Sequence, residues 1–477
     1  MRQRVGKLIG LLPGGEEGTL HRRLYRRIRT LIEQGMLQAG ERMPATRSLA
    51  EDLGLSRNTV LAAVEQLVAE GLLEARPRSG TFVADLRHRV EAAAAPAGGH
   101  VSAIIGTSGP VPVPFAPALP GPDLFPIGVW RKLQARVWRD LPRSALYQGE
   151  GVGWPPLRVA IAHHVGITRG LRCRPEQVIV TNTTSAALDW AIRTLARTGD
   201  EVWVEDPGPA RSLGPWMRSG GLRPVPVPVD EDGLDVDAAR AAAPGARLAF
   251  VTPTSQLPTC SILSPARRRS LVDWAATAGS WIVELDEIAD FLLGAGPGKP
   301  PLAAAEPGRV VYVGSFNRFL FPALGVAFLV IPADLCDLAE AGRGFTGGRA
   351  TVTDQMVLLD FLESAHYPAF IRRLRDAAQE RREALSTAVA QQFGDALLLQ
   401  ERAPAFHLCA KAAAPLQAAE LARAAAAAGV ELHSLSDYAV TLRRPDELLF
   451  GFAAYRPHEI RGAMRKLAAQ ARAAGRD

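Results

Sequence analysis

Short apolar runs alternate with helix-length segments over much of the chain, and this alternation restricts the fold more than any other feature. The first examples are an apolar run at 178–181, a helical stretch at 185–196 and a second run at 201–206. Strands joined by helix-length crossovers pair in parallel, and the helices then cover both faces of the sheet. Further strands are predicted at 224–230, 248–253, 281–286, 310–316 and 326–332, with helices near 211–220 and at 264–278.

The amino-terminal segment has a different pattern. An amphipathic helix is predicted over 21–35, a short helix over 46–53 and a third over 57–70, with Ser56 placed to cap its start. Two short strands around a basic turn follow within 72–83. This order is that of a helix-turn-helix followed by a wing, in which the start of the last helix enters the major groove.

Charge also separates the two parts of the chain. The whole sequence has 55 Lys+Arg and 49 Asp+Glu, a net charge of +6. Nearly all of that excess positive charge lies in the first ninety residues. This is expected when a small basic nucleic-acid-binding domain is joined to a larger, nearly neutral domain. A stretch rich in Ala, Pro and Gly marks a linker. The predicted domains are 1–88, a linker at 89–117, and 118–477, the last divided into 118–360 and a smaller 361–477.

Several classes of protein are disfavoured. No run of eighteen apolar residues is present, and the charged start at Met1–Arg4 is unlike a signal peptide, so a soluble cytoplasmic protein without membrane contact is expected. The cysteines Cys173, Cys260, Cys336 and Cys409 lie far apart without metal-binding spacing, so buried thiols and no metal site are predicted.

The run MPATRSLAEDLGLSRNTVLAAVEQLVAEGLL, followed by RSGTFV, resembles the winged-helix domain of the GntR family of regulators. The resemblance implies binding of double-stranded DNA. Arg57, at the first turn of the second motif helix, is the best-placed reader of a guanine. The residues implied to contact DNA are Arg47, Ser56, Arg57, Asn58, Thr59 and Gly80.

The rest of the chain resembles the fold-type I aminotransferase domain of the MocR subfamily of GntR regulators. The resemblance rests on runs such as GVGWPPLRVAIAHHV, VIVTNTTSAALD, FVTPTSQLPT and VVYVGSFNRFLFPALGVAFLV, in this order. It implies an α/β domain with a smaller carboxy-terminal part and a head-to-tail, domain-swapped homodimer. It also implies a pocket for pyridoxal 5'-phosphate (PLP) that senses vitamin B6 or an amino compound.

The residue that binds PLP covalently is missing from the expected place. The family has a lysine in a GTFSK-type run, and the matching run here is GSFNR, which ends at Arg318. A guanidinium stays protonated at neutral pH and does not form an imine. The five lysines of the chain, Lys7, Lys132, Lys299, Lys411 and Lys466, all lie away from this run. No covalent PLP is therefore expected.

Other contacts that the resemblance implies are also lost. A gapless match to the family's EDDY run puts Leu285 where an aspartate pairs with the pyridine nitrogen, and Glu287 where a tyrosine contacts the cofactor. A shift of one residue would offer Asp286, but neighbouring strand residues face opposite ways. The arginine that binds the phosphate falls at Gly325, and another tyrosine at Pro209.

Polar groups remain that could hold an anion at a strand-to-helix junction. The candidate pocket residues are Asn182, Thr183, Thr184, Asp286, Ser315 and Arg318. The alternative for the junction residues is simple helix capping. For Arg318 two hypotheses stay open. It either binds a carboxylate or phosphate of a small anionic effector, or pairs with Asp286 or Glu287 and leaves a domain that only dimerises.

The sequence thus predicts a transcription regulator with a non-catalytic aminotransferase-like domain, not an enzyme. One alternative is a regulator that binds PLP or pyridoxamine phosphate non-covalently. The other is an active PLP-dependent aminotransferase, which would need a lysine that the expected strand lacks.

Overall fold

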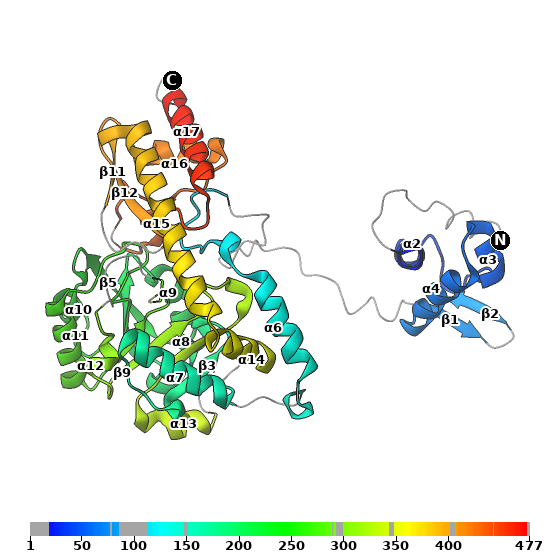
Figure 1. Cartoon of the computed structure of the whole chain (residues 1–477), viewed down its shortest axis with the longest axis horizontal. Helices are drawn as coiled ribbons and strands as arrows, with labels where there is room; N and C mark the ends of the chain where they lie inside the picture. Colours follow the sequence, from blue (N-terminus) through cyan, green and yellow to red (C-terminus); the bar gives the residue numbers. More distant parts are fainter. Residues whose placement is uncertain are drawn as a thin grey trace. The chain divides into compact units, whose positions relative to one another are not determined.

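The computed structural model describes residues 19–76, 79–84, 113–146, 151–288, 290–291, 299–342, 348–400, 406–441 and 443–474. The chain divides into two compact units, residues 1–103 and 104–477 (Figure 1). The predicted linker residues 89–112 lie outside the described part. Among the described residues, no helix is long and apolar enough to cross a membrane.

The first unit is a winged helix. Its elements are α2 (Leu20–Glu33), α3 (Thr46–Leu53), α4 (Arg57–Ala69), β1 (Leu73–Arg76) and β2 (Gly80–Val83), and the two strands pair antiparallel. All three predicted helices and the wing are confirmed. Leu24 of α2, Leu49 of α3 and Leu67 of α4 are fully buried together, so one apolar core fixes the angle between the helices.

Local signals explain where these helices begin and end. Gly54 ends α3 in the left-handed conformation, with φ of 63°, which costs glycine no steric strain. The Ser56 hydroxyl accepts a hydrogen bond from the Thr59 backbone N–H at 3.1 Å and so caps α4. The chain between Gly54 and Ser56 therefore turns sharply and starts α4 at a fixed position.

The second unit contains an eight-stranded sheet with the order β3-β10-β9-β8-β7-β4-β5-β6. Strand β10 runs antiparallel to both neighbours, whereas β4, β5, β7, β8 and β9 pair in parallel, so the prediction of a mostly parallel sheet is confirmed. The strands are β3 (Val178–Thr181), β4 (Glu201–Asp206), β5 (Arg223–Asp230), β6 (Gly233–Leu234), β7 (Leu248–Val251), β8 (Trp281–Leu285), β9 (Val310–Ser315) and β10 (Ala327–Val330).

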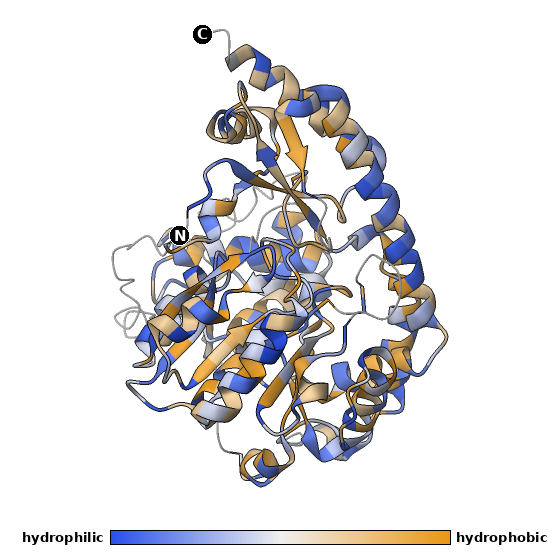
Figure 2. Cartoon of the chain, turned by 90° about the vertical axis from the view of Figure 1, so that its left-hand side faces the viewer, coloured by the Kyte–Doolittle hydropathy of each residue, from blue (hydrophilic) through white to orange (hydrophobic). Residues whose placement is uncertain are grey.

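Helices cover both faces of this sheet, because alternate strand residues are apolar on each side. Along β9, Tyr312 joins the core shared with α7, and Val313 joins the core shared with α8. Figure 2 shows apolar strands enclosed by helices with hydrophilic outer faces. The helices are α6 (Ile127–Arg139), α7 (Pro155–Arg169), α8 (Thr184–Leu195), α9 (Ala210–Ser219), α10 (Val236–Ala242), α11 (Pro265–Ala278), α12 (Leu302–Ala305), α13 (Cys336–Glu340) and α14 (Val352–Leu362).

The carboxy-terminal part adds a four-stranded antiparallel sheet, ordered β11-β12-β14-β13. Its elements are α15 (His366–Phe393), β11 (Leu397–Leu399), β12 (His407–Ala412), α16 (Ala418–Ala428), β13 (His433–Ser434), β14 (Glu447–Gly451) and α17 (Pro457–Ala474). Phe115, which the sequence analysis grouped with the linker, is fully buried here, 5.5 Å from the Phe450 ring. Its carbonyl accepts the Gly451 N–H. Residues 113–117 therefore belong to this fold and not to the linker.

Candidate functional site

The first turn of α4 presents the predicted DNA-reading residues. Arg57 and Asn58 are exposed, whereas Val60, one turn further along, is fully buried against the other helices. The buried residues of α4 thus attach its inner face to the core and leave its amino-terminal end exposed. That end is the part of a recognition helix that contacts base edges. Thr59 is half-buried, and its hydroxyl lies 2.8 Å from that of Ser56.

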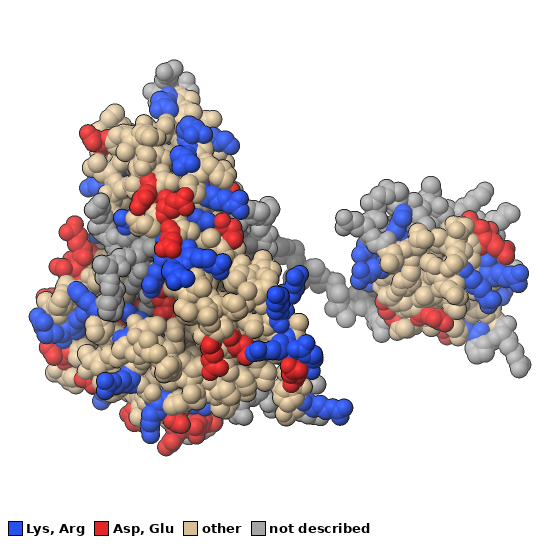
Figure 3. Space-filling view, in the orientation of Figure 1, with Lys and Arg blue, Asp and Glu red and all other residues tan. Residues whose placement is uncertain are grey.

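The two remaining predicted DNA contacts lie on other elements of the winged helix. Arg47 on α3 is exposed and pairs with Glu51, at 3.6 Å. Gly80 begins β2 with φ of 112°, and an added Cβ would lie 3.0 Å from the Arg42 guanidinium. The sequence analysis missed Arg42. It and Arg76 lie over the Phe82 ring, at 6.0 and 4.7 Å from its centre. Figure 3 shows basic side chains on opposite flanks of this unit.

In the larger unit, Glu287 brings together the start of α8 and the segment after β9. Its carboxylate accepts a hydrogen bond from the Thr184 hydroxyl at 2.5 Å. The Arg318 Nε lies 3.4 Å from the other carboxylate oxygen. The arginine side chain is 37% exposed and that of Glu287 is 21% exposed. Of the two acids proposed as partners for Arg318, the structure therefore shows Glu287 and not Asp286.

The junction between β3 and α8 is capped by its own residues. The Thr183 hydroxyl accepts the Ala186 N–H at 3.1 Å, as expected for a helix cap. The Asn182 N–H donates to the Gly348 carbonyl, and the Asn182 carbonyl accepts from the Asn317 side chain at 3.0 Å. Helix capping, the simpler alternative for Thr183, is thus present.

Leu285 and Asp286 face opposite sides of the sheet. Leu285 packs in the apolar core under α8. Asp286 points to the other side, where its carboxylate accepts hydrogen bonds from Arg169 at 2.8 Å and from the Tyr312 hydroxyl at 3.1 Å. Burial raises the pKa of Asp286, and the Arg169 charge opposes that rise. Asp286 is therefore held on the α7 side, away from Thr184.

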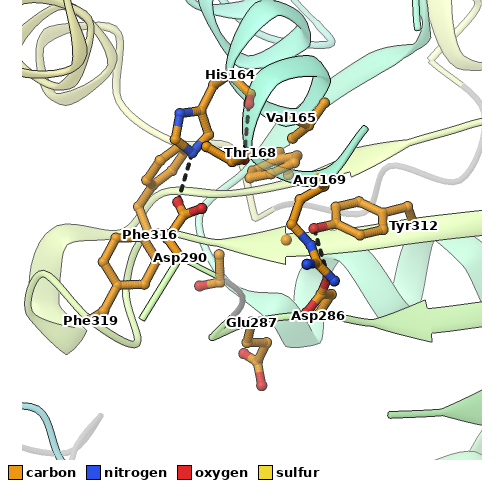
Figure 4. A pocket seen from close by; sticks show the side chains of 13 residues that line it. His164, Val165, Thr168, Arg169, Asp286, Glu287, Asp290, Tyr312, Phe316 and Phe319 are labelled. Atoms are coloured by element: carbon orange, nitrogen blue, oxygen red, sulfur yellow. Dashed lines mark hydrogen bonds and ion pairs between the residues drawn. The ribbon is translucent and has the colours of Figure 1, made fainter. Parts of the chain in front are cut away.

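A pocket with about 280 Å³ of empty space, part of it open to solvent, lies beside this ion pair. Asp286 and Ser315 line it, but Asn182, Thr183, Thr184 and Arg318 do not. Its walls come from α7, β9, β10 and the segments after β8 and β9 (Figure 4).

The sequence analysis missed a second polar group in this pocket. The Asp290 carboxylate lies 2.6 Å from the His164 Nε2 (Figure 4). It also accepts the Tyr367 hydroxyl at 2.5 Å. Burial alone raises the pKa of Asp290, but the His164 charge and both hydrogen bonds lower it below its usual value. No sequence signal joins these residues, because they come from α7, the loop after β8 and α15.

The lysines lie elsewhere. Lys132, Lys299, Lys411 and Lys466 are the lysines within the described residues, and all four are exposed. None of them lines the pocket. Lys411 pairs with Asp446 at 3.3 Å, on β12 of the small sheet.

Comparison with known proteins supports the architecture of both units. The model of the bacterial regulatory proteins of the gntR family matches residues 20–83. The probable rhizopine catabolism regulatory protein MocR of Rhizobium meliloti is 34% identical over 94% of this chain and 93% of its own length. The pyridoxine biosynthesis transcriptional regulator PdxR of Corynebacterium glutamicum is 30% identical over 77% of this chain and 78% of its own.

The larger unit has the fold of solved aminotransferases. The α-aminoadipate aminotransferase LysN of Thermus thermophilus aligns with a TM-score of 0.66 and 25% identity, over 76% of this chain and 92% of that chain. The predicted fold class, a winged helix followed by a fold-type I α/β domain, is confirmed. The chain belongs to the MocR-like regulators of the GntR family, and it is a DNA-binding transcription regulator with an aminotransferase-like domain.

Proposed function

We propose that the aminotransferase-like domain of this regulator catalyses no amino transfer and serves for dimerisation and effector sensing. The observation that carries this proposal is the position of Glu287 between Thr184 and Arg318. The start of a helix attracts anions because its backbone N–H groups are unpaired. Here a carboxylate of the chain itself is bonded to the Thr184 side chain at the first residue of α8, where its charge opposes a phosphate.

The residues present do not fit PLP as a covalent cofactor. Arg318, which the family match aligns with the lysine, cannot form an imine. Leu285, aligned with the pyridine partner, lies in an apolar core, and Asp286 faces away and is paired with Arg169. We therefore assign no catalytic residue.

Dimerisation, which the family resemblance implies, is supported by large apolar side chains on the surface. Ile127 and Trp138 of α6 are 68% and 60% exposed, and Val159 and Ile167 of α7 are 54% and 70% exposed. Both helices pack against α14, and exposed apolar side chains are typical of surfaces that pack against another chain. The proposal is a homodimer that acts on DNA in the cytoplasm.

The proposed effector is a small anion that contacts Arg318. Its Nε is directed to Glu287, and the structure records no hydrogen bond for its two terminal nitrogens among the described residues. A planar guanidinium with two free terminal groups suits a carboxylate or a phosphate. Binding would shift Arg318 away from Glu287 and so connect ligand binding to the start of α8.

The experiment is a DNA-binding titration of the full-length protein with labelled operator DNA, followed by fluorescence anisotropy. The operator is first selected from random DNA. Candidate carboxylates, pyridoxamine phosphate and PLP are then added in turn. The proposal predicts that an active anion changes the Kd of the wild type and has no effect on Arg318→Ala. If pyridoxamine phosphate instead binds saturably to both the wild type and Arg318→Ala, the result would favour a regulator that binds this B6 compound non-covalently.

A further inference from the structure

Cys260, His407 and Cys409 place two thiols and an imidazole together inside the larger unit. Cys260 follows β7, and the other two residues lie on β12 of the small sheet. The three are 2%, 4% and 2% exposed. One ligand atom from each lies within 4.8 Å of the others, and the Cys260 Sγ is 3.4 Å from the His407 Nε2. The cluster therefore connects two segments separated by almost 150 residues.

The distances suit a tetrahedral zinc ion. Zn²⁺ binds sulfur at about 2.3 Å and imidazole nitrogen at about 2.0 Å, so that sulfur and nitrogen ligands are about 3.5 Å apart. Residues two apart on a strand, such as His407 and Cys409, project to the same face. Two thiolates would also balance the charge of a divalent cation, which reduces the cost of burying it.

The polar groups of the cluster are incompletely satisfied. The Pro258 carbonyl is the shared acceptor, 2.9 Å from the His407 Nε2 and 3.1 Å from the Cys409 Sγ. The His407 Nδ1 is buried and has no hydrogen-bond partner among the described residues. The Pro258 carbonyl is bonded to Nε2, the same ring nitrogen that lies near the Cys260 Sγ, so a metal bound at Nε2 would replace this hydrogen bond.

The backbone at Cys260 is also unusual. Its φ is +57°, in the left-handed region that favours glycine. A cysteine at such a position is uncommon, and it directs its side chain toward His407 and Pro258.

We propose that Cys260, His407 and Cys409 form a binding site for a thiophilic divalent metal ion, with Zn²⁺ as the expected occupant. Soft sulfur ligands combined with one imidazole favour zinc over calcium or magnesium. Three protein ligands leave the fourth position for water or another small ligand. The metal would join the loop after β7 to the small sheet, so its binding would fix the position of the carboxy-terminal part against the large sheet. Sequence spacing predicted no metal site, because the ligands are distant in the chain.

The test is a Co²⁺ titration of full-length protein that has been reduced and freed of metal with a chelator. Tetrahedral cobalt bound to thiolates gives intense charge-transfer absorbance. We expect one Co²⁺ per chain, displacement of cobalt by Zn²⁺, and at least a tenfold loss of affinity in Cys409→Ser and in His407→Gln. Cys336→Ser is the control, because Cys336 is a buried thiol outside the cluster.

Two results would overturn the proposal. One is a folded wild type that shows no thiolate–cobalt absorbance at stoichiometric cobalt. The other is unchanged cobalt absorbance in both Cys260→Ser and Cys409→Ser. The wild-type titration decides the question even if a variant fails to fold.

Discussion

The Thr184 hydroxyl donates a hydrogen bond to the Glu287 carboxylate at 2.5 Å, and thereby directs this carboxylate to the first turn of α8. Arg318 approaches the same carboxylate from the segment after β9. A negative charge near the start of a helix is favourable, because the helix dipole is positive there. The chain thus supplies its own anion beside the strand-to-helix junction, where the sequence analysis predicted polar groups that could hold one.

The first prediction concerns two arginines that pair with neighbouring acids. Arg169 and Asp286 are 4% and 0% exposed, so Arg169→Ala leaves a buried carboxylate unpaired and should lower the free energy of unfolding by about 3 to 5 kcal/mol. Arg318 and Glu287 are partly exposed, so Arg318→Ala should cost less than about 1 kcal/mol. Denaturant unfolding measures both. Equal losses would contradict the assigned burial of these pairs.

The second prediction tests whether Glu287 prevents an amine at position 318 from reacting with PLP. Arg318→Lys introduces an amine where the family has its lysine, but Glu287 should keep that amine protonated as an ion pair. This variant alone is expected to form no borohydride-stable adduct with PLP. Adding Glu287→Gln removes the competing charge and should allow measurable adduct formation, detected by mass spectrometry. An equal adduct yield in the single and double variants would show that Glu287 has no such role.

The third prediction concerns recognition of DNA. Arg57→Ala should weaken specific binding by about 1 to 3 kcal/mol and change the preferred base at one position of each half-site. Arg193→Ala is the control, because it removes one positive charge from α8, where Arg193 pairs with Asp189. Selection of binding sequences from random DNA measures both effects. If Arg57→Ala selects the same sequence as the wild type, Arg57 does not read a base.

The fourth prediction is a pH dependence from Glu284. Burial and the nearby Asp286 charge raise the pKa of Glu284 to about 7, from 4.5 in an unfolded chain. The unfolded state loses this proton first as pH rises, so the free energy of unfolding should fall between about pH 4.5 and 7 and then level off. The contribution is on the order of a few kcal/mol.

Glu284→Gln should remove this part of the pH dependence, whereas Glu340→Gln, which changes an exposed glutamate, should not. Denaturant unfolding at several pH values measures the slope. Identical slopes in the wild type and Glu284→Gln would mean that Glu284 ionises normally in the folded protein.

Local patterns in the sequence predicted most of the fold. Ser56 and Gly54 mark the turn of the winged helix, and strand and helix periods placed the elements of the large sheet within a few residues. Residues 113–117 were misassigned to the linker, because a proline-rich segment without a period gave no sign that Phe115 is buried under β14. Such burial depends on a partner more than 300 residues away in the chain.

The arrangement of the candidate sites was harder to predict than the fold, because it depends on tertiary contacts. The sequence could name Glu287 and Asp286 as alternative partners for Arg318, but only the pleat at the end of β8 shows that they face different sides. The pair of His164 and Asp290, and the approach of Cys260 to Cys409, join elements far apart in the chain. Spacing rules apply to ligands on one element or loop, so they gave no signal here.

The most direct test of the central claim is to incubate the wild-type protein with PLP, reduce it with borohydride and determine the intact mass and the absorbance spectrum. The account predicts no added pyridoxyl phosphate mass at stoichiometric PLP and a spectrum equal to that of free PLP. A stoichiometric adduct on any one lysine would contradict it. Peptide mapping of that lysine would then identify the residue that has replaced the missing one.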